Sequence, residues 1–196
     1  MRWILVLLLI SSCAIFRAND SLIGKSNSDL TSMIPASADG RARINLNNEE
    51  YLLSLEYNID SNTRHLQAAL QSTFSGEQIF ELQLDNVESV RLTQSEKIWV
   101  HFLQKIFQQK HIKSLNATMV VMSAKSVWSQ ALGFQKLDAI ESQLDKGSWC
   151  LIQKLKNSQI SKLCFSQVLA KSFTKIEHIF QNEQTQEFIK QEWFLK

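Results

Sequence analysis

The chain has 196 residues, of which 44% are hydrophobic and 20% charged, with a single proline and five glycines. Such a chain can bury a sizeable core, so its composition suits one domain and excludes extensive disorder beyond the first forty residues. Its formal net charge of +2 is too balanced to indicate a nucleic-acid partner, and we expect none.

The first predicted element is a signal peptide over residues 1–14. A short basic start precedes the apolar run Trp3–Ile10, which is too short for a membrane anchor and typical of a secretory signal. The sequence up to Cys13 resembles a bacterial lipobox, which would leave Cys13 lipidated. Small residues there suit ordinary cleavage after Ala14 instead. Either route predicts export, to the periplasm or as a cell-envelope lipoprotein, with membrane attachment only through a lipid on Cys13.

Residues 15–40 are rich in Ser, Asn, Asp and Ala, and we interpret them as a flexible lead-in. The single domain then covers residues 41–196. From Tyr51 to Ile59 apolar and polar side chains alternate with period two, which predicts a half-buried strand. Asn47-Asn48 tolerates the positive φ of a tight turn, so we expect a hairpin that brings Arg43 beside the start of that strand.

The next segments predict alternating helices and strands. Leu66, Ala69, Leu70 and Phe74 have helical spacing. Thr93 and Glu96 form a capping-box pattern. The expected elements are a helix over 63–74, a strand over 78–87, a helix over 93–109, a strand over 117–122 and a helix over 124–132 ended by Gly133.

A second hairpin is predicted around Asn157, which lies midway between Cys150 and Cys164. Folding the chain there places Trp149 opposite Phe165 and the two cysteines opposite each other, at a separation that suits a disulfide. A Cys150–Cys164 disulfide in an exported protein and two small buried thiols are both open. Beyond residue 170, aromatic residues at helical spacing predict two short helices, or one broken near residue 182.

The search for chemistry finds no catalytic site. The four histidines lie far apart with no second ligand at metal-binding spacing, and there is no glycine-rich phosphate loop or nucleophile elbow. We therefore expect no catalytic residue, no metal and no cofactor. Arg43 is the remaining candidate, because an arginine beside an aromatic strand can bind a carboxylate bidentately. The alternative is a surface arginine paired with Glu50 or Glu56.

The chain resembles the exported bacterial branch of the chalcone isomerase-like family. Gly40-Arg41-Ala42-Arg43 stands where that family has a Gly-x-Arg stretch before its first strand tyrosine, here Tyr51. Leu55-Glu56-Tyr57 stands near the family's Leu-Tyr pair, and Lys146-Gly147-Ser148 near its Lys-Gly-Asp turn. The Asp of that turn and the closing Ile-Trp-Leu-Gly motif are missing, and residues 117–133 are extra.

The resemblance implies a ligand-binding domain. Arg43 would correspond to the family's anion-binding arginine and Tyr51 to its strand tyrosine, while the other catalytic positions of the plant isomerases have no counterpart. We therefore expect a non-enzymatic α+β domain, with a largely antiparallel sheet and helices packed on one face. It would hold a fatty acid or another small hydrophobic acid between the sheet and the helices.

A second likeness competes with the first. The expected order of strands and helices up to Leu132-Gly133-Phe134 is similar to a sulfate-transporter/anti-sigma-antagonist domain. That likeness implies a protein-interaction module without an internal pocket. Export and the hairpin after residue 147 argue against it, because such a domain leaves the last fifty residues unexplained.

Overall fold

The computed structural model describes residues 22–72, 76–87, 91–145 and 147–196. The expected signal peptide, Cys13 and the first part of the lead-in lie outside these ranges. The described helices are α2 (Asn27–Ser32), α3 (Gln94–Gln109) and α4 (Ala117–Ala131). The described strands are β1 (Ser37–Leu46), β2 (Glu49–Asp60), β3 (His65–Ser72), β4 (Gly76–Gln83), β5 (Ile140–Asp145), β6 (Ser148–Lys154), β7 (Gln159–Leu169), β8 (Ser172–Asn182) and β9 (Phe188–Leu195).

The described strands form a single antiparallel sheet in the order β4-β3-β2-β1-β9-β8-β7-β6-β5. Two meanders, β1–β4 and β5–β9, are each built from neighbouring strands that follow one another in the chain. They join where the first strand, β1, pairs with the last, β9. The strand predicted at Tyr51 and the hairpin predicted at Asn157 therefore belong to one sheet.

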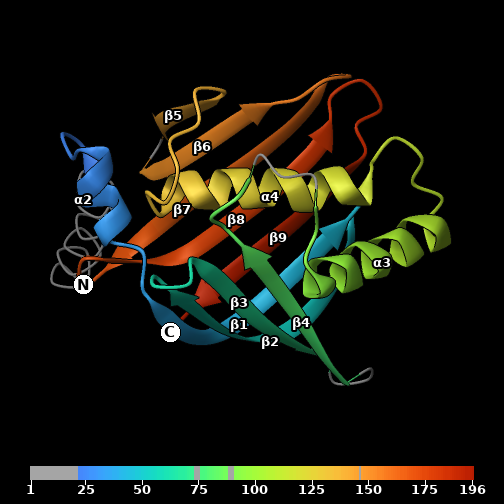
Figure 1. Cartoon of the computed structure of the whole chain (residues 1–196), viewed down its shortest axis with the longest axis horizontal. Coiled ribbons are helices and arrows are strands. Elements are labelled where there is room, and N and C mark those ends of the chain that lie inside the picture. Colours follow the sequence, from blue (N-terminus) through green and yellow to red (C-terminus); the bar gives the residue numbers. More distant parts are fainter. Residues whose placement is uncertain (1–21, 73–75, 88–90, 146) are drawn as a thin grey trace, which may run out of the picture.

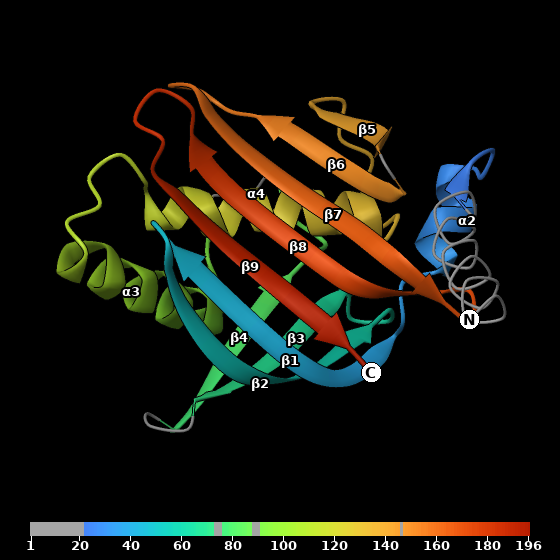
Figure 2. The same cartoon turned by 180° about the vertical axis from the view of Figure 1, so that it is seen from behind.

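Figures 1 and 2 show α3 and α4 on the same side of this sheet, which we call the inner face; the opposite side is the outer face. Helix α4 packs against β6 and β7, and α3 packs against β4 and α4. The β1–β4 half of the sheet curls toward the helices (Figure 1). The predicted α+β class, with a largely antiparallel sheet and helices on one face, is confirmed.

The core lies between the inner face and the helices, and aromatic side chains dominate it. Trp128 on α4 stacks on Trp193 of β9 with 5.6 Å between ring centroids. Trp149 of β6 stacks on Phe165 of β7 at 5.3 Å. Because aromatic pairs stabilise a core beyond the area that they bury, the contacts of Trp128 with Trp193 and Phe165 fix α4 against the β5–β9 meander.

Two local predictions are confirmed. Asn47 and Asn48 turn with φ of 46° and 73°, and the hairpin they form sets Arg43 opposite Leu52. Helix α3 begins at the expected capping box, in which the Thr93 hydroxyl accepts from the Glu96 N–H and the Glu96 carboxylate accepts from the Thr93 N–H. Both signals involve only residues close together in the sequence, so the tertiary contacts around them do not change the local structure that they predict.

The helix expected over residues 63–74 is wrong, because this segment contains strand β3. Leu66 and Leu70 fit both a helical spacing and a period of two, but the buried residue between them is Ala68 rather than Ala69. Strand β3 hydrogen-bonds to β2 on one side and to β4 on the other. These two ladders, formed with distant residues, override the local helical pattern.

The strand expected over 117–122 is also wrong, because it is the first part of the single helix α4. Asn116 caps this helix by accepting from the Met119 N–H. The helix is buried on nearly every side, and a short apolar run of this kind does not distinguish a buried strand from a buried helix. The predicted end of the helix at Gly133 is correct, with a φ of 68°.

The C-terminal helices are wrong as well, since residues 172–195 form strands β8 and β9. Phe173, Ile176 and Phe180 are all buried and have helical spacing. In the structure Ile176 and Phe180 follow the period of a strand. Phe173 also points inward, next to the break in the β7–β8 pairing at Gln167, whose φ is 54°.

The lead-in expected to be flexible is packed from Leu22 onward. Helix α2 carries a complete capping box at Ser26 and Asp29. Leu22, Leu30 and Met33 are buried. Because these apolar side chains leave water on packing, they hold the segment against the domain.

Candidate functional site

A groove on the outer face, formed entirely by described residues, is the candidate site. It has a volume of about 630 Å³ and crosses strands β1, β2, β3 and β9. Two arginines, apolar side chains and two polar groups line it: Arg41, Ala42, Arg43, Leu52, Leu53, Ser54, Gln71 and Phe194. A concave, mainly apolar surface with a few charged groups is typical of a small-molecule site.

The sheet register explains how these residues meet. Arg41 lies opposite Ser54 on one side and opposite Phe194 on the other, while Arg43 lies opposite Leu52. Residues two apart on a strand point to the same face. The two arginines of β1 therefore project together over the outer face.

Gly40 permits the tight pairing of β1 and β9 at the end of this groove. A Cβ added at this glycine would lie 2.0 Å from the carbonyl oxygen of Phe194. No side chain fits in that space. The sequence showed a glycine before two arginines, but only the pairing with the last strand explains it.

Arg43, the arginine singled out in the sequence, lies on the outer face rather than between the sheet and the helices. Its Nη1 lies 3.3 Å from the Glu50 carboxylate and 4.0 Å from the Glu192 carboxylate. Its guanidinium also lies over the Phe194 ring, 5.7 Å from the ring centroid. The alternative expected for Arg43, an ion pair with Glu50, is therefore present.

Tyr51 does not share the groove with Arg43. It lies opposite Ile44, an inner-face residue, and its hydroxyl donates to the Glu49 carboxylate. Because adjacent positions of a strand point to opposite faces, Arg43 and Tyr51 lie on opposite sides of the sheet. The structure does not bring the two predicted ligand residues together.

A network of ion pairs borders the groove on β8 and β9. Glu177 contacts Lys175 and Lys190, and both lysines also contact Glu192 at 3.0–3.1 Å. Burial opposes ionisation of Glu192, but hydrogen bonds from Lys190 and Lys175 outweigh it and hold its pKa below the usual range. Glu192 is therefore a carboxylate at neutral pH, and it in turn pairs with Arg43.

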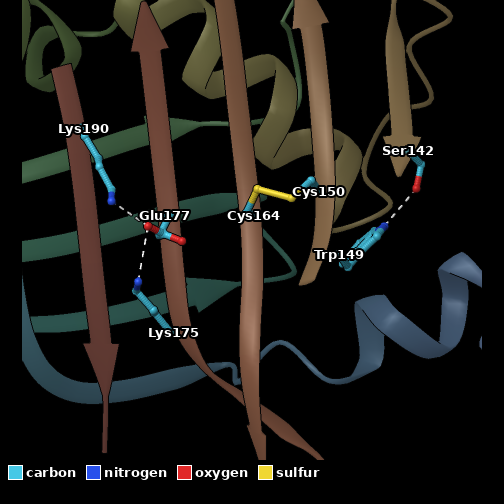
Figure 3. Close-up of a disulfide and its surroundings, with 7 residues drawn as sticks. All are labelled: Ser142, Trp149, Cys150, Cys164, Lys175, Glu177 and Lys190. Carbon is cyan, nitrogen blue, oxygen red and sulfur yellow. Dashed lines mark hydrogen bonds and ion pairs between the residues drawn. A yellow bond between two sulfur atoms is a disulfide. The ribbon is translucent and has the colours of Figure 1, made fainter. Parts of the chain in front are cut away.

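Cys150 and Cys164 form a disulfide between β6 and β7. Figure 3 shows it beside Glu177 on the outer face, the face away from the helices. The register is the one expected from the sequence, with Trp149 opposite Phe165 and the two cysteines opposite each other. The bond links two strands of the β5–β9 meander and lies outside the groove.

The interior contains polar groups that the sequence did not reveal. The Ser161 hydroxyl and His178 Nε2 are 3.0 Å apart, and burial lowers the pKa of His178 to about 4. A second pair joins the Lys125 ammonium to the Glu96 carboxylate at 2.9 Å, with both side chains at most 3% exposed. Each pair is enclosed by packed elements, so we assign both to the core.

Within the described ranges, no group of His, Cys, Asp and Glu side chains has the arrangement of a metal site. No helix in this part of the chain has the length and apolar character needed to cross a bilayer. Comparison of the chain with protein-family models, with curated proteins and with solved structures finds no match. The elements that suggested a sulfate-transporter/anti-sigma-antagonist domain differ in the structure, since residues 65–72 are a strand and residues 117–122 are helical.

Proposed function

We propose that this protein is an exported, non-enzymatic domain that binds a small hydrophobic acid, such as a fatty acid, in the outer groove. The observation that carries the proposal is the lining of that groove, which combines two guanidinium groups with Leu52 and Phe194. A guanidinium binds a carboxylate, and apolar side chains bind the hydrocarbon tail. The resemblance to the chalcone isomerase-like family implies the same class of ligand, although it places the ligand between the sheet and the helices.

Several features of the groove support a ligand rather than a solvated surface. Leu52 is 69% exposed although it is a large apolar residue, so covering it would release water. The lining residues supply positive charge, apolar surface, the Ser54 hydroxyl and the Gln71 amide. These groups suit the binding of a small acid. We therefore propose binding without a chemical step.

The apolar contribution gives the proposal a measurable magnitude. Each buried CH₂ group contributes about 0.8 kcal/mol, which is roughly a fourfold gain in affinity. Affinity for straight-chain acids should therefore rise steadily with chain length until the tail outgrows the groove. Calorimetric titration of the purified protein with octanoate, decanoate and dodecanoate, each below its micelle concentration, measures this series.

A matched pair of variants locates the site. Ser54→Trp fills the groove, whereas Ser166→Trp places the same ring on the outer face of β7, beyond the groove. We expect Ser54→Trp to abolish binding and Ser166→Trp to retain it. Absence of binding in the unaltered protein, or equal loss in both variants, would reject the outer groove as the site.

A further inference from the structure

We infer that Arg41, rather than Arg43, is the group that binds the acid, and that the ligand carries a single negative charge on a carboxylate. This inference rests on the proposed function, because it concerns the same groove. Arg43 then acts as a positioning residue that holds one wall of the groove. The two roles follow from what each guanidinium already contacts.

The guanidinium of Arg43 is already occupied. A carboxylate binds an arginine through two parallel N–H groups, either Nε with Nη2 or Nη1 with Nη2. In Arg43 the Nη1 atom is paired with Glu50, and Nε is buried and has no partner among the described residues. A carboxylate therefore cannot bind Arg43 at two points. The Nε–Nη2 pair is blocked because Nε is buried, and the Nη1–Nη2 pair is blocked because Nη1 is already paired with Glu50.

The guanidinium of Arg41 is available. Arg41 is exposed and lines the groove, and within the described ranges no ion pair or hydrogen bond involves its guanidinium. Asp39 and Glu56 lie nearby on the same face, opposite each other and two positions further along their strands, but neither is within 4.0 Å of it. All the N–H groups of the Arg41 guanidinium are thus available to bind a ligand at two points.

The ion-pair network beside the groove leaves no second cation free for a ligand, which favours a ligand with one negative charge. The connected ion-pair network contains three cations, Arg43, Lys175 and Lys190, and three carboxylates, Glu50, Glu177 and Glu192. It is neutral without Arg41. One uncompensated guanidinium suits a carboxylate, whereas a phosphate monoester carries between one and two charges and would need a second free cation.

The groove also gives the bound acid a direction. Arg41 lies opposite Ser54, and the exposed Leu52 lies further along β2. The acidic side chains Asp39 and Glu56 line a separate groove beyond Arg41. A carboxylate at Arg41 therefore points its tail away from these acids, toward Leu52 and Phe194.

The inference is tested by dodecanoate binding to three variants of the full protein. Arg41→Gln removes a charge-assisted pair of hydrogen bonds, so we expect affinity to fall at least tenfold. Arg41→Lys keeps the charge without the fork and should give an intermediate loss. Arg43→Gln should change affinity less than about threefold. Arg43→Lys serves the same purpose if Arg43→Gln does not fold.

Two further ligands, one uncharged and one carrying more than one negative charge, separate charge recognition from simple packing. Dodecanol should bind the unaltered protein and Arg41→Gln equally, and dodecyl phosphate should bind more weakly than dodecanoate. If Arg43→Gln abolishes binding while Arg41→Gln retains it, the inference is overturned and the proposed function stands. If the unaltered protein binds no acid in the chain-length series, both are overturned.

Discussion

The buried imidazole of His178 predicts that acid destabilises this protein over a defined pH range. Its side chain is buried on the inner face of β8, and its Nε2 lies 3.0 Å from the Ser161 hydroxyl. Burial lowers its pKa from 6.5 to about 4, because a charged imidazolium in the core has lost its water. The unfolded chain, in contrast, protonates this imidazole near pH 6.5.

The sign and size of the effect follow from these two pKa values. Between pH 6.5 and pH 4 the unfolded state binds the proton and the folded state does not, so stability falls as the pH falls. Above pH 6.5 both states are neutral and the contribution of His178 is constant. The difference of roughly 2.5 pH units corresponds to about 3 kcal/mol lost on reaching pH 4.

Carboxylates titrate in the same range, so the test compares a variant with the unaltered protein. His178→Gln cannot gain a proton, yet its amide can still hydrogen-bond to Ser161. We expect this variant to be less stable at pH 7 and to show a shallower loss of stability toward pH 4. Urea unfolding at intervals between pH 7 and pH 4 measures both slopes.

His101→Gln, at an exposed position on α3, is the matched control and should leave the slope unchanged. The reasoning is refuted if His178→Gln has the same pH slope as the unaltered protein. It is also refuted if the imidazole of His178 in the folded protein titrates near pH 6.5 by nuclear magnetic resonance.

Three further perturbations test the frame around the groove. Replacing Cys150 and Cys164 together by alanine removes a crosslink over 14 residues. We expect it to lower the free energy of unfolding by about 3 kcal/mol, with no further loss on adding reductant. Lys125→Met leaves Glu96 buried without its cation and should lower the free energy of unfolding by about 3–5 kcal/mol. Adding Glu96→Gln to this variant should restore part of that loss, as measured by urea unfolding. Gly40→Ala places a methyl group 2.0 Å from a carbonyl oxygen of β9 and should lower stability by about 1–3 kcal/mol, whereas an unchanged melting temperature would contradict the close approach.

The elements that depend on neighbouring residues could be predicted from the amino-acid sequence. The hairpin at Asn47-Asn48 and the hairpin at Asn157 both have turn residues that accept positive φ. Alternation of apolar residues then set the register on each side, which also placed Cys150 opposite Cys164. Helix α3 was predicted in the same way, because its capping box satisfies its own first N–H groups.

Segments whose local pattern fits both a helix and a strand could not be predicted in this way, because long-range pairing sets their conformation. Strands β3, β8 and β9 each pair with a strand on either side, and those ladders outweigh helical spacing. The site depends on the same long-range pairing. β9 brings Phe194 and Glu192 to β1, where both contact Arg43 in addition to the Glu50 that the local hairpin already places beside it. No local signal in residues 40–44 predicts this, because the partner strand lies about 150 residues further along the chain.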